Sequence, residues 1–234
     1  MRIIQESETL YRLTRFGVVN CFLVREASGF TLVDTGLPGS AGRILQAANA
    51  LGAPIETIAL THAHFDHVGS VESLVEALPG VELAIGVREN RLLRGDFSLD
   101  PGERGKPIVG FQRVSPHATQ LLQEGDRVGT LRVVNSPGHT PGHVSFLDER
   151  DNSLLAGDAF TTQMGLLAAG VFRLTFPFPA LFSWNAERAA ASAAKLAGLK
   201  PTRLAVGHGA TLRDPVARME RAAEVALRAH GRAA

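Results

Sequence analysis

The chain has 234 residues, of which 45% are hydrophobic and 20% charged, a composition typical of a folded globular protein. Its 24 basic and 23 acidic residues are interspersed and give a formal net charge of +1, without the basic block that a nucleic-acid surface needs. No segment approaches the ~20 apolar residues of a membrane span, the N-terminus has no apolar signal core, and Cys21, the single cysteine, excludes an internal disulfide. We therefore expect one cytoplasmic domain over residues 1–234, with no nucleic-acid or membrane partner.

Short apolar segments alternate with helical patterns in the first half of the chain. Strands are predicted at residues 18–24, 30–33, 58–60 and 81–85, and helices at 41–51 and from 70 onward. Ser40 is the expected cap of the first helix, and Gly52 is its stop.

An irregular insertion is predicted at about residues 95–117, where glycine and proline interrupt the pattern. Strands then follow at 131–134, 144–147, 153–156 and 204–206, and helices at 186–196 and from Asp214-Pro215 to about 228. Strands in both halves, each half closing with helices, favour an α/β (α+β) fold of four layers, with two sheets face to face and helices outside. Composition alone also fits a doubly wound α/β fold.

The run Thr61-His62-Ala63-His64-Phe65-Asp66-His67 holds four strong metal ligands within six positions. Imidazole and carboxylate together suit zinc and its neighbours in the first transition row. His62 and His64 are two residues apart, which places both side chains on one side of an extended segment. Asp66 and His67 follow a bend and point elsewhere, so this one segment can serve two adjacent metals. The alternative, a polar loop whose histidines only form hydrogen bonds, does not explain four ligands at this spacing.

Three further apolar strands end in a metal ligand close to glycine. Residues 131–134 lead to Gly138-His139, residues 153–156 to Gly157-Asp158, and residues 204–206 to Gly207-His208. Loops on a rigid scaffold are where catalytic groups tend to lie. A single Gly-Asp pair is more often a turn, but three such strand ends together with the run at 61–67 favour a metal site.

These elements resemble the metallo-β-lactamase fold superfamily of metallohydrolases. The matching segments, which appear in the family's order, are Asp34-Thr35-Gly36, residues 61–69, residues 136–140, Gly157-Asp158 and Gly207-His208. The resemblance implies a four-layer αββα sandwich with a two-metal site at one edge of the sheets. Position by position, it implies that His62, His64 and His139 bind the first metal, that Asp66, His67 and His208 bind the second, and that Asp158 bridges them.

Two further residues match family positions outside the coordination spheres. Asp34 matches an aspartate that usually supports a ligand, although a plain turn former remains an equal alternative. His143 is expected to have a structural or hydrogen-bonding role rather than to bind metal, because the ligand set is already complete.

The implied chemistry is hydrolysis by a hydroxide that bridges two divalent metals, two Zn²⁺ with Mn²⁺ or Fe²⁺ as alternatives. The metals would also polarise the substrate's carbonyl oxygen, and Asp66 would orient the hydroxide and pass a proton to the leaving group. Asp158 argues against a true β-lactamase, so the resemblance is to the glyoxalase II and lactonase-like branch. Tyr11, the only tyrosine, lies far in sequence from the ligands, which weakens the tyrosine-assisted variants of that branch.

The expected substrate is a small molecule, an acyl ester, thioester or lactone. An iron-dependent oxidoreductase like the persulfide dioxygenases, a phosphodiesterase, and a catalytically silent binding protein remain alternatives. An apolar, lid-like segment at about residues 160–184 is either a pocket wall for an acyl group or, slightly favoured, core packing or a homodimer contact.

Overall fold

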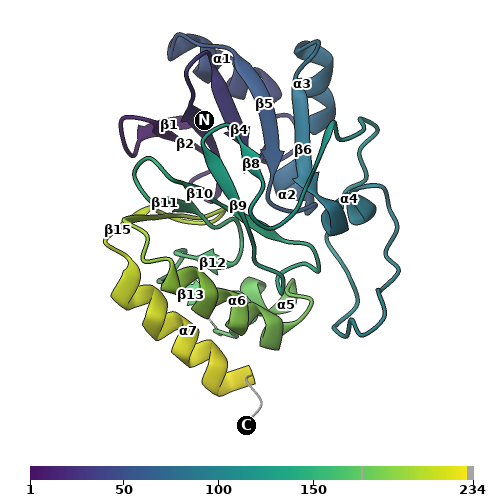
Figure 1. Cartoon of the computed structure of the whole chain (residues 1–234), viewed down its shortest axis with the longest axis vertical. Coiled ribbons are helices and arrows are strands. Elements are labelled where there is room, and N and C mark those ends of the chain that lie inside the picture. Colours follow the sequence, from purple (N-terminus) through teal and green to yellow (C-terminus); the bar gives the residue numbers. More distant parts are fainter. Residues whose placement is uncertain (175, 231–234) are drawn as a thin grey trace.

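Two β-sheets lie face to face in the computed structural model, with helices on the outer side of each (Figure 1). The structure describes residues 1–174 and 176–230. Position 175 of the predicted segment at 160–184 therefore lies outside the described residues. Positions 231–234, at the end of the predicted domain, also lie outside them. The first sheet runs in the order β1-β2-β3-β4-β5-β6-β7. Its strands are β1 Arg2–Gln5, β2 Leu10–Arg15, β3 Val19–Arg25, β4 Phe30–Val33, β5 Ile55–Leu60, β6 Glu82–Gly86 and β7 Gln120–Leu122.

The second sheet runs in the order β15-β14-β11-β10-β9-β8. Its strands are β8 Arg127–Val128, β9 Leu131–Asn135, β10 Val144–Asp148, β11 Ser153–Leu155, β14 Arg203–Ala205 and β15 Leu212–Arg213, and β12 Phe160–Thr161 pairs separately with β13 Leu167–Ala168. In the first sheet β1 to β4 are antiparallel, and β4 to β7 are parallel. In the second sheet β11 and β14 are parallel. Parallel neighbours carry their carboxyl ends to the same edge of a sheet, and this is the edge where the ligand-bearing loops begin.

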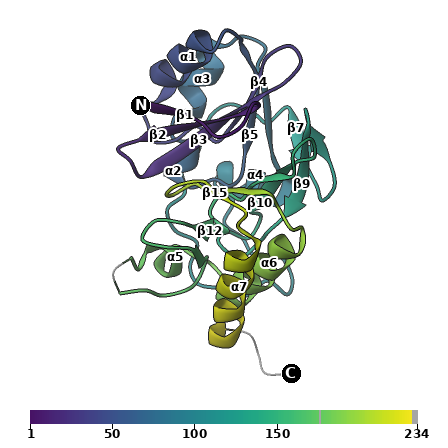
Figure 2. The same cartoon turned by 90° about the vertical axis from the view of Figure 1, so that its left-hand side faces the viewer.

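Helices cover the outer faces of both sheets (Figure 2). The helices are α1 Ala41–Ala50, α2 Phe65–Val68, α3 Val71–Ala77, α4 Val87–Leu93, α5 Phe178–Leu181, α6 Ala186–Gly198 and α7 Val216–His230. Helices α1 and α3 lie beyond the first sheet, and α6 and α7 lie beyond the second (Figures 1 and 2). No helix among the described residues is both long and apolar enough to cross a membrane.

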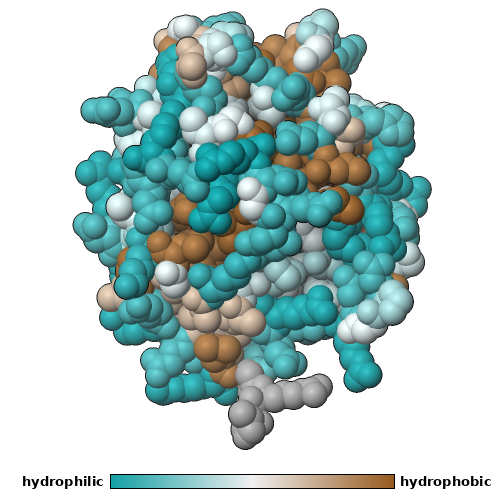
Figure 3. Space-filling model, viewed as in Figure 1, coloured by the Kyte–Doolittle hydropathy of each residue, from teal (hydrophilic) through white to brown (hydrophobic). Residues whose placement is uncertain are grey.

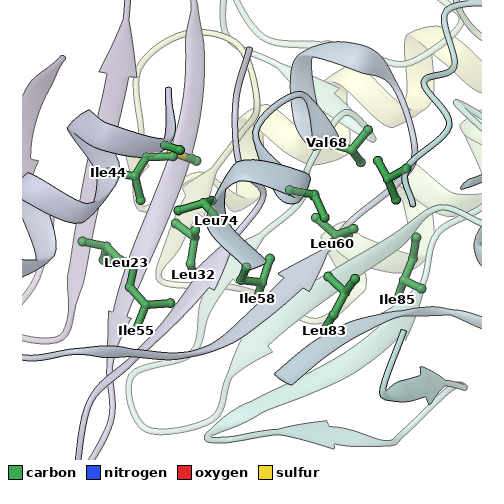
Figure 4. Packing of buried hydrophobic residues seen from close by; sticks show 14 of the residues in the cluster. Leu23, Leu32, Ile44, Ile55, Ile58, Leu60, Val68, Leu74, Leu83 and Ile85 are labelled. Carbon is green, nitrogen blue, oxygen red and sulfur yellow. The ribbon is translucent and has the colours of Figure 1, made fainter. Parts of the chain in front are cut away.

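The alternation of side chains along the strands divides the core into three clusters. On β3, Leu23 faces the layer of α1 and α3, whereas Phe22 and Val24 face the second sheet. Figure 4 shows the outer cluster, in which Ile44 and Leu74 of the helices pack on strand residues. A third cluster buries α6 and α7 against the second sheet. Three buried layers require four layers of structure, which confirms the predicted sandwich over the doubly wound alternative.

Two local features bear on the predicted elements. Ser40 occupies the N-cap position of α1 but makes no capping hydrogen bond, because its hydroxyl instead accepts from Nη1 of Arg15 at 2.8 Å. The stretch between Leu93 and Gln120 contains no helix or strand, and it carries an isolated bridge from Phe111 to His64. The face drawn in Figure 3 is mainly hydrophilic, with hydrophobic residues in separate areas.

Candidate metal centre

Four loops at one edge of the sandwich bring together all seven residues that the sequence predicted as ligands. His62 and His64 follow β5, Asp66 and His67 lie on the short helix α2, His139 lies between β9 and β10, Asp158 follows β11, and His208 follows β14. The two sheets are joined at this edge, because the backbone N–H of Val144 donates to Thr61 O at 3.0 Å and that of Asn20 to Gly207 O at 2.9 Å. The edge is therefore a fixed frame for the loops.

Three histidine nitrogens converge in the first group. Nδ1 of His64 lies 3.1 Å from Nε2 of His62 and 3.0 Å from Nε2 of His139. All three side chains are buried. Burial lowers the pKa of His64 to about 4 and lowers those of His62 and His139 well below their ordinary values. Neutral imidazoles with converging lone pairs form a geometry that a cation stabilises.

The second group combines histidines with carboxylates. Nε2 of His208 lies 3.3 Å from Oδ2 of Asp66, and Nε2 of His67 lies 3.4 Å from Oδ1 of Asp158. Burial disfavours charge on both histidines, but the nearby carboxylates together outweigh it, with Asp158 contributing most for both, Asp66 also for both, and Asp34 also for His67. The pKa of His67 is therefore held well above its ordinary value, and that of His208 is raised to about 10. Burial opposes ionisation of Asp66 as well, yet the nearby His67 and His208 lower its pKa to about 2. The protons on these histidines are those that a bound cation would displace.

Asp158 lies between the two groups. Its Oδ2 is 3.2 Å from Nε2 of His208 and 3.5 Å from Nε2 of His139. The seven residues fall into three overlapping sets that could each hold a metal ion: His62, His64 and His139; His62, His67 and Asp158; and Asp66, His67 and His208.

A second observation indicates that these side chains suit a metal ion. Some of their buried polar atoms have no hydrogen-bond partner. Nε2 of His67 and Oδ1 of Asp158 are two such atoms, and both face the cluster. The two atoms form only the 3.4 Å ion pair described above, without a hydrogen bond, and coordination to a metal would satisfy both. Imidazole and carboxylate together favour zinc or another first-row divalent ion.

Asp34 holds His67 and Thr61 in place. Its Oδ2 lies 2.8 Å from Nδ1 of His67, and its Oδ1 accepts from the backbone N–H of Thr61 at 2.8 Å. Asp34 also has φ of +60°, in the left-handed region that turn residues adopt. Asp34 is therefore both a turn residue and a support for His67 and Thr61.

His143 supports the Asp158 loop from outside the ligand set. The backbone N–H of Asp158 donates to Nε2 of His143 at 3.1 Å, so this nitrogen must be unprotonated. The proton then lies on Nδ1, which is 2.8 Å from the hydroxyl of Ser136. Burial lowers the pKa of His143 to about 3, which keeps the ring neutral.

Glu89 is a supporting residue that the sequence analysis missed. It is fully buried on α4, and its carboxylate accepts from the backbone N–H groups of Ala63 and Gly142, both at 3.0 Å, and from the hydroxyl of Thr140 at 2.9 Å. One carboxylate thus ties the loop of His62 and His64 to the loop of His139. A signal existed, because Glu89 shares a helical face with Leu92 and Leu93 at the i, i+3, i+4 spacing of core residues.

A cavity of about 280 Å³ opens directly on the cluster. His64, Asp66, His139, Asp158 and His208 form part of its wall, so a small molecule in the cavity would contact the candidate ligands.

Comparison with known proteins agrees with this geometry. Residues 14–208 match the Metallo-beta-lactamase superfamily. The chain belongs to this superfamily. It is 46% identical to the uncharacterized protein YobT of Bacillus subtilis, over 97% of this chain and 99% of that protein. It is 34% identical to the probable metallo-hydrolase YflN of the same bacterium, over 82% and 81% of the two chains.

A hydroxyacylglutathione hydrolase of Aeromonas hydrophila is 30% identical, over 73% of this chain but only 55% of that protein. Among solved structures, TTHA1623 in a di-iron-bound form matches with a TM-score of 0.65 at 27% identity, over 88% of this chain and 94% of that one. BJP-1, a subclass B3 metallo-beta-lactamase of Bradyrhizobium japonicum, matches over 98% of this chain and 92% of its own with a TM-score of 0.65, and at 23% identity it shows the fold alone. This is a metallo-hydrolase family, and the chain carries its His and Asp candidate metal site.

Proposed function

We propose that this protein is a binuclear metal-dependent hydrolase that cleaves an acyl ester, thioester or lactone. The observation that carries the proposal is the position of Asp158, with one carboxylate oxygen close to a histidine of each group. A shared carboxylate of this kind suits two adjacent metals better than one.

In this proposal His62, His64 and His139 hold one metal, Asp66, His67 and His208 hold the other, and Asp158 serves both. When bound, two such cations would supply Lewis acidity to the substrate's carbonyl oxygen and would lower the pKa of a bound water to about 7. No serine or cysteine nucleophile is then required. Cys21 is buried in β3, and burial raises the pKa of its thiol, so it is a poor nucleophile.

Asp66 is the proposed catalytic residue. Its carboxylate lines the cavity, and its low pKa keeps it ionised at neutral pH. An ionised carboxylate can accept a hydrogen bond from the attacking water and so orient it, and it can then transfer the proton to the leaving group. His67 and His208 hold Asp66 in this ionised state.

The proposal extends to the metal, the partners and the location. Zinc is the proposed metal, with manganese or iron as alternatives, and the partner is a small molecule rather than a nucleic acid or a membrane. A cytoplasmic location and a homodimer are proposed on the sequence arguments alone. The similar protein TTHA1623 was solved in a di-iron-bound form, which supports iron as the alternative to test.

Metal analysis and a substrate screen test the proposal together. The protein is purified aerobically, its metal content is measured, and zinc, manganese and iron forms are assayed on thioesters, lactones, aryl esters and phosphodiesters. Two zinc ions per chain with acyl hydrolysis support the proposal. One iron per chain with oxygen uptake on glutathione persulfide would replace it with the oxidoreductase alternative, and cleavage of phosphodiesters alone would make it a phosphodiesterase.

A further inference from the structure

Apart from the candidate ligands, the wall of the cavity is mainly apolar, and half of its residues are phenylalanines. Phe65 of α2, Phe178 of α5 and Phe182 just after α5 line it, together with Phe160 and Phe176. The rings contact one another, with centroids 5.4 Å apart for Phe176 and Phe178 and 6.3 Å apart for Phe178 and Phe182. The ring of Phe182 lies 6.3 Å from that of His64, so this apolar wall reaches the first histidine group.

The cavity wall contains no lysine or arginine among the described residues that line it. Lys106 and Arg173, two basic residues of neighbouring segments, do not line the cavity. Nζ of Lys106 donates to the carbonyl oxygen of Ala180 at 3.0 Å, and Nη1 of Arg173 donates to that of Met164 at 2.5 Å. An anionic substituent in the cavity would therefore lose water without gaining a cationic partner beyond the metals, which is costly.

We propose that this cavity selects a neutral hydrocarbon acyl group and rejects glutathione thioesters, which carry two carboxylates. The inference rests on the proposed acyl hydrolysis and specifies its substrate class. Phe178 and Phe182 bind the acyl chain, and the carbonyl group lies toward Asp66 and Asp158. At about 280 Å³, the cavity is near the lower limit of the ~300–1,000 Å³ of small-molecule pockets, which suits a medium-length chain.

The first test is a series of N-acetylcysteamine thioesters from acetyl to decanoyl, assayed with the zinc protein. Each buried methylene is worth ≈ 0.8 kcal/mol, so kcat/KM should rise about fourfold per methylene until the cavity is filled. With the acyl group fixed as lactoyl, the neutral N-acetylcysteamine thioester should be cleaved faster than the glutathione thioester. A flat series, or preference for the glutathione thioester, would overturn the inference while leaving acyl hydrolysis in place.

The second test uses two variants of matched exposure in one segment. Phe178 is 52% exposed and lines the cavity, whereas Phe172 is 62% exposed and does not. Phe178→Lys should flatten the chain-length series and raise the relative rate on the glutathione thioester, because it places a cation at the wall. Phe172→Lys should leave both ratios as in the parent. Equal effects of the two substitutions would contradict a specific role for the cavity.

A third measurement separates the cavity from the chemistry. Octanamide, a neutral compound without an ester, is titrated calorimetrically into the metal-free protein beside acetamide. Octanamide should bind more tightly than acetamide, with a negative heat-capacity change that Phe178→Lys reduces. This result would support the inference even if no ester is cleaved. In that case only the proposed function would fail. No difference between the two amides would overturn the inference.

Discussion

Nδ1 of His67 lies 2.8 Å from Oδ2 of Asp34, a contact that keeps a proton on Nδ1 and leaves Nε2 as the nitrogen available to a metal. Asp34→Asn should weaken metal binding roughly 10- to 100-fold. An amide has one oxygen, so it cannot accept from both Thr61 N–H and His67, and either orientation brings two donors together. Zinc affinity, measured by competition with a chromogenic chelator, checks this outcome.

The matched control for Asp34→Asn is Asp148→Asn. Asp148 is similarly buried, but it lies on β10 and pairs with Arg150. This substitution should lower stability and leave zinc affinity unchanged. Equal loss of zinc affinity in both variants would mean that Asp34 acts only through general stability.

Gly207 should not tolerate a side chain. A Cβ built there would lie 2.2 Å from Oδ1 of Asp158 and 2.6 Å from Cε1 of His67. Gly207→Ala should therefore displace at least one of these residues and reduce metal content without unfolding the domain, as seen by atomic absorption and circular dichroism. Gly198→Ala on α6 is the control, because nothing lies within 4 Å of its Cβ position and alanine is the better helix former. Full metal content in Gly207→Ala would contradict this close packing.

The candidate ligands could be identified from the sequence because each is marked locally. The run at 61–67 holds four of them, and His139, Asp158 and His208 each follow an apolar strand beside a glycine. The strand-and-helix order likewise predicted the four layers. The sequence did not predict β1 and β2, which are short or exposed on one side. It also did not predict the helix α4, whose helical spacing of core positions includes the charged Glu89 beside Leu92 and Leu93.

Roles that depend on distant partners could not be predicted. Asp34 remained open between a turn and a support because its partners, Thr61 and His67, are far along the chain. His143 was expected to form hydrogen bonds, and its Nε2 accepts one from the N–H of Asp158. The segment at 160–184 divides: Trp184 is buried and does not line the cavity, Phe160 is buried and lines it, and Phe178 and Phe182 line it and are partly exposed.

Glu89 should give the metal-free protein a distinctive pH dependence. Burial raises its pKa from 4.5 to about 7, despite three hydrogen bonds that lower it. Between these values the folded state keeps a proton that the unfolded state has lost, so its contribution to stability is complete below pH 4.5 and is lost as pH rises to about 7. The shift corresponds to about 3 kcal/mol.

Glu89→Gln removes this titration. In urea unfolding of the metal-free proteins, the parent should lose about 3 kcal/mol relative to the variant between pH 4.5 and 7, while the buried histidines contribute equally to both. The variant should also bind zinc more weakly. Its amide NH₂ group would face the backbone N–H of Gly142 or Ala63, and two donors cannot form the hydrogen bond that ties the ligand loops together. Parallel pH profiles for the two proteins would show that Glu89 does not titrate in this range.

The number of zinc ions bound per chain should differ between variants of the two histidine groups and variants of Asp158, which lies between them. His139→Ala removes a ligand of the first group only, and His208→Ala one of the second only, so each variant should retain close to one zinc ion per chain. Asp158→Ala should weaken both sites and lose most of the bound zinc, and both His139→Ala and Asp158→Ala should lose most hydrolytic activity. His117→Ala, an exposed histidine of the irregular segment, is the control and should match the parent. Two zinc ions and full activity in Asp158→Ala would refute its shared role, since neither group would then depend on that carboxylate.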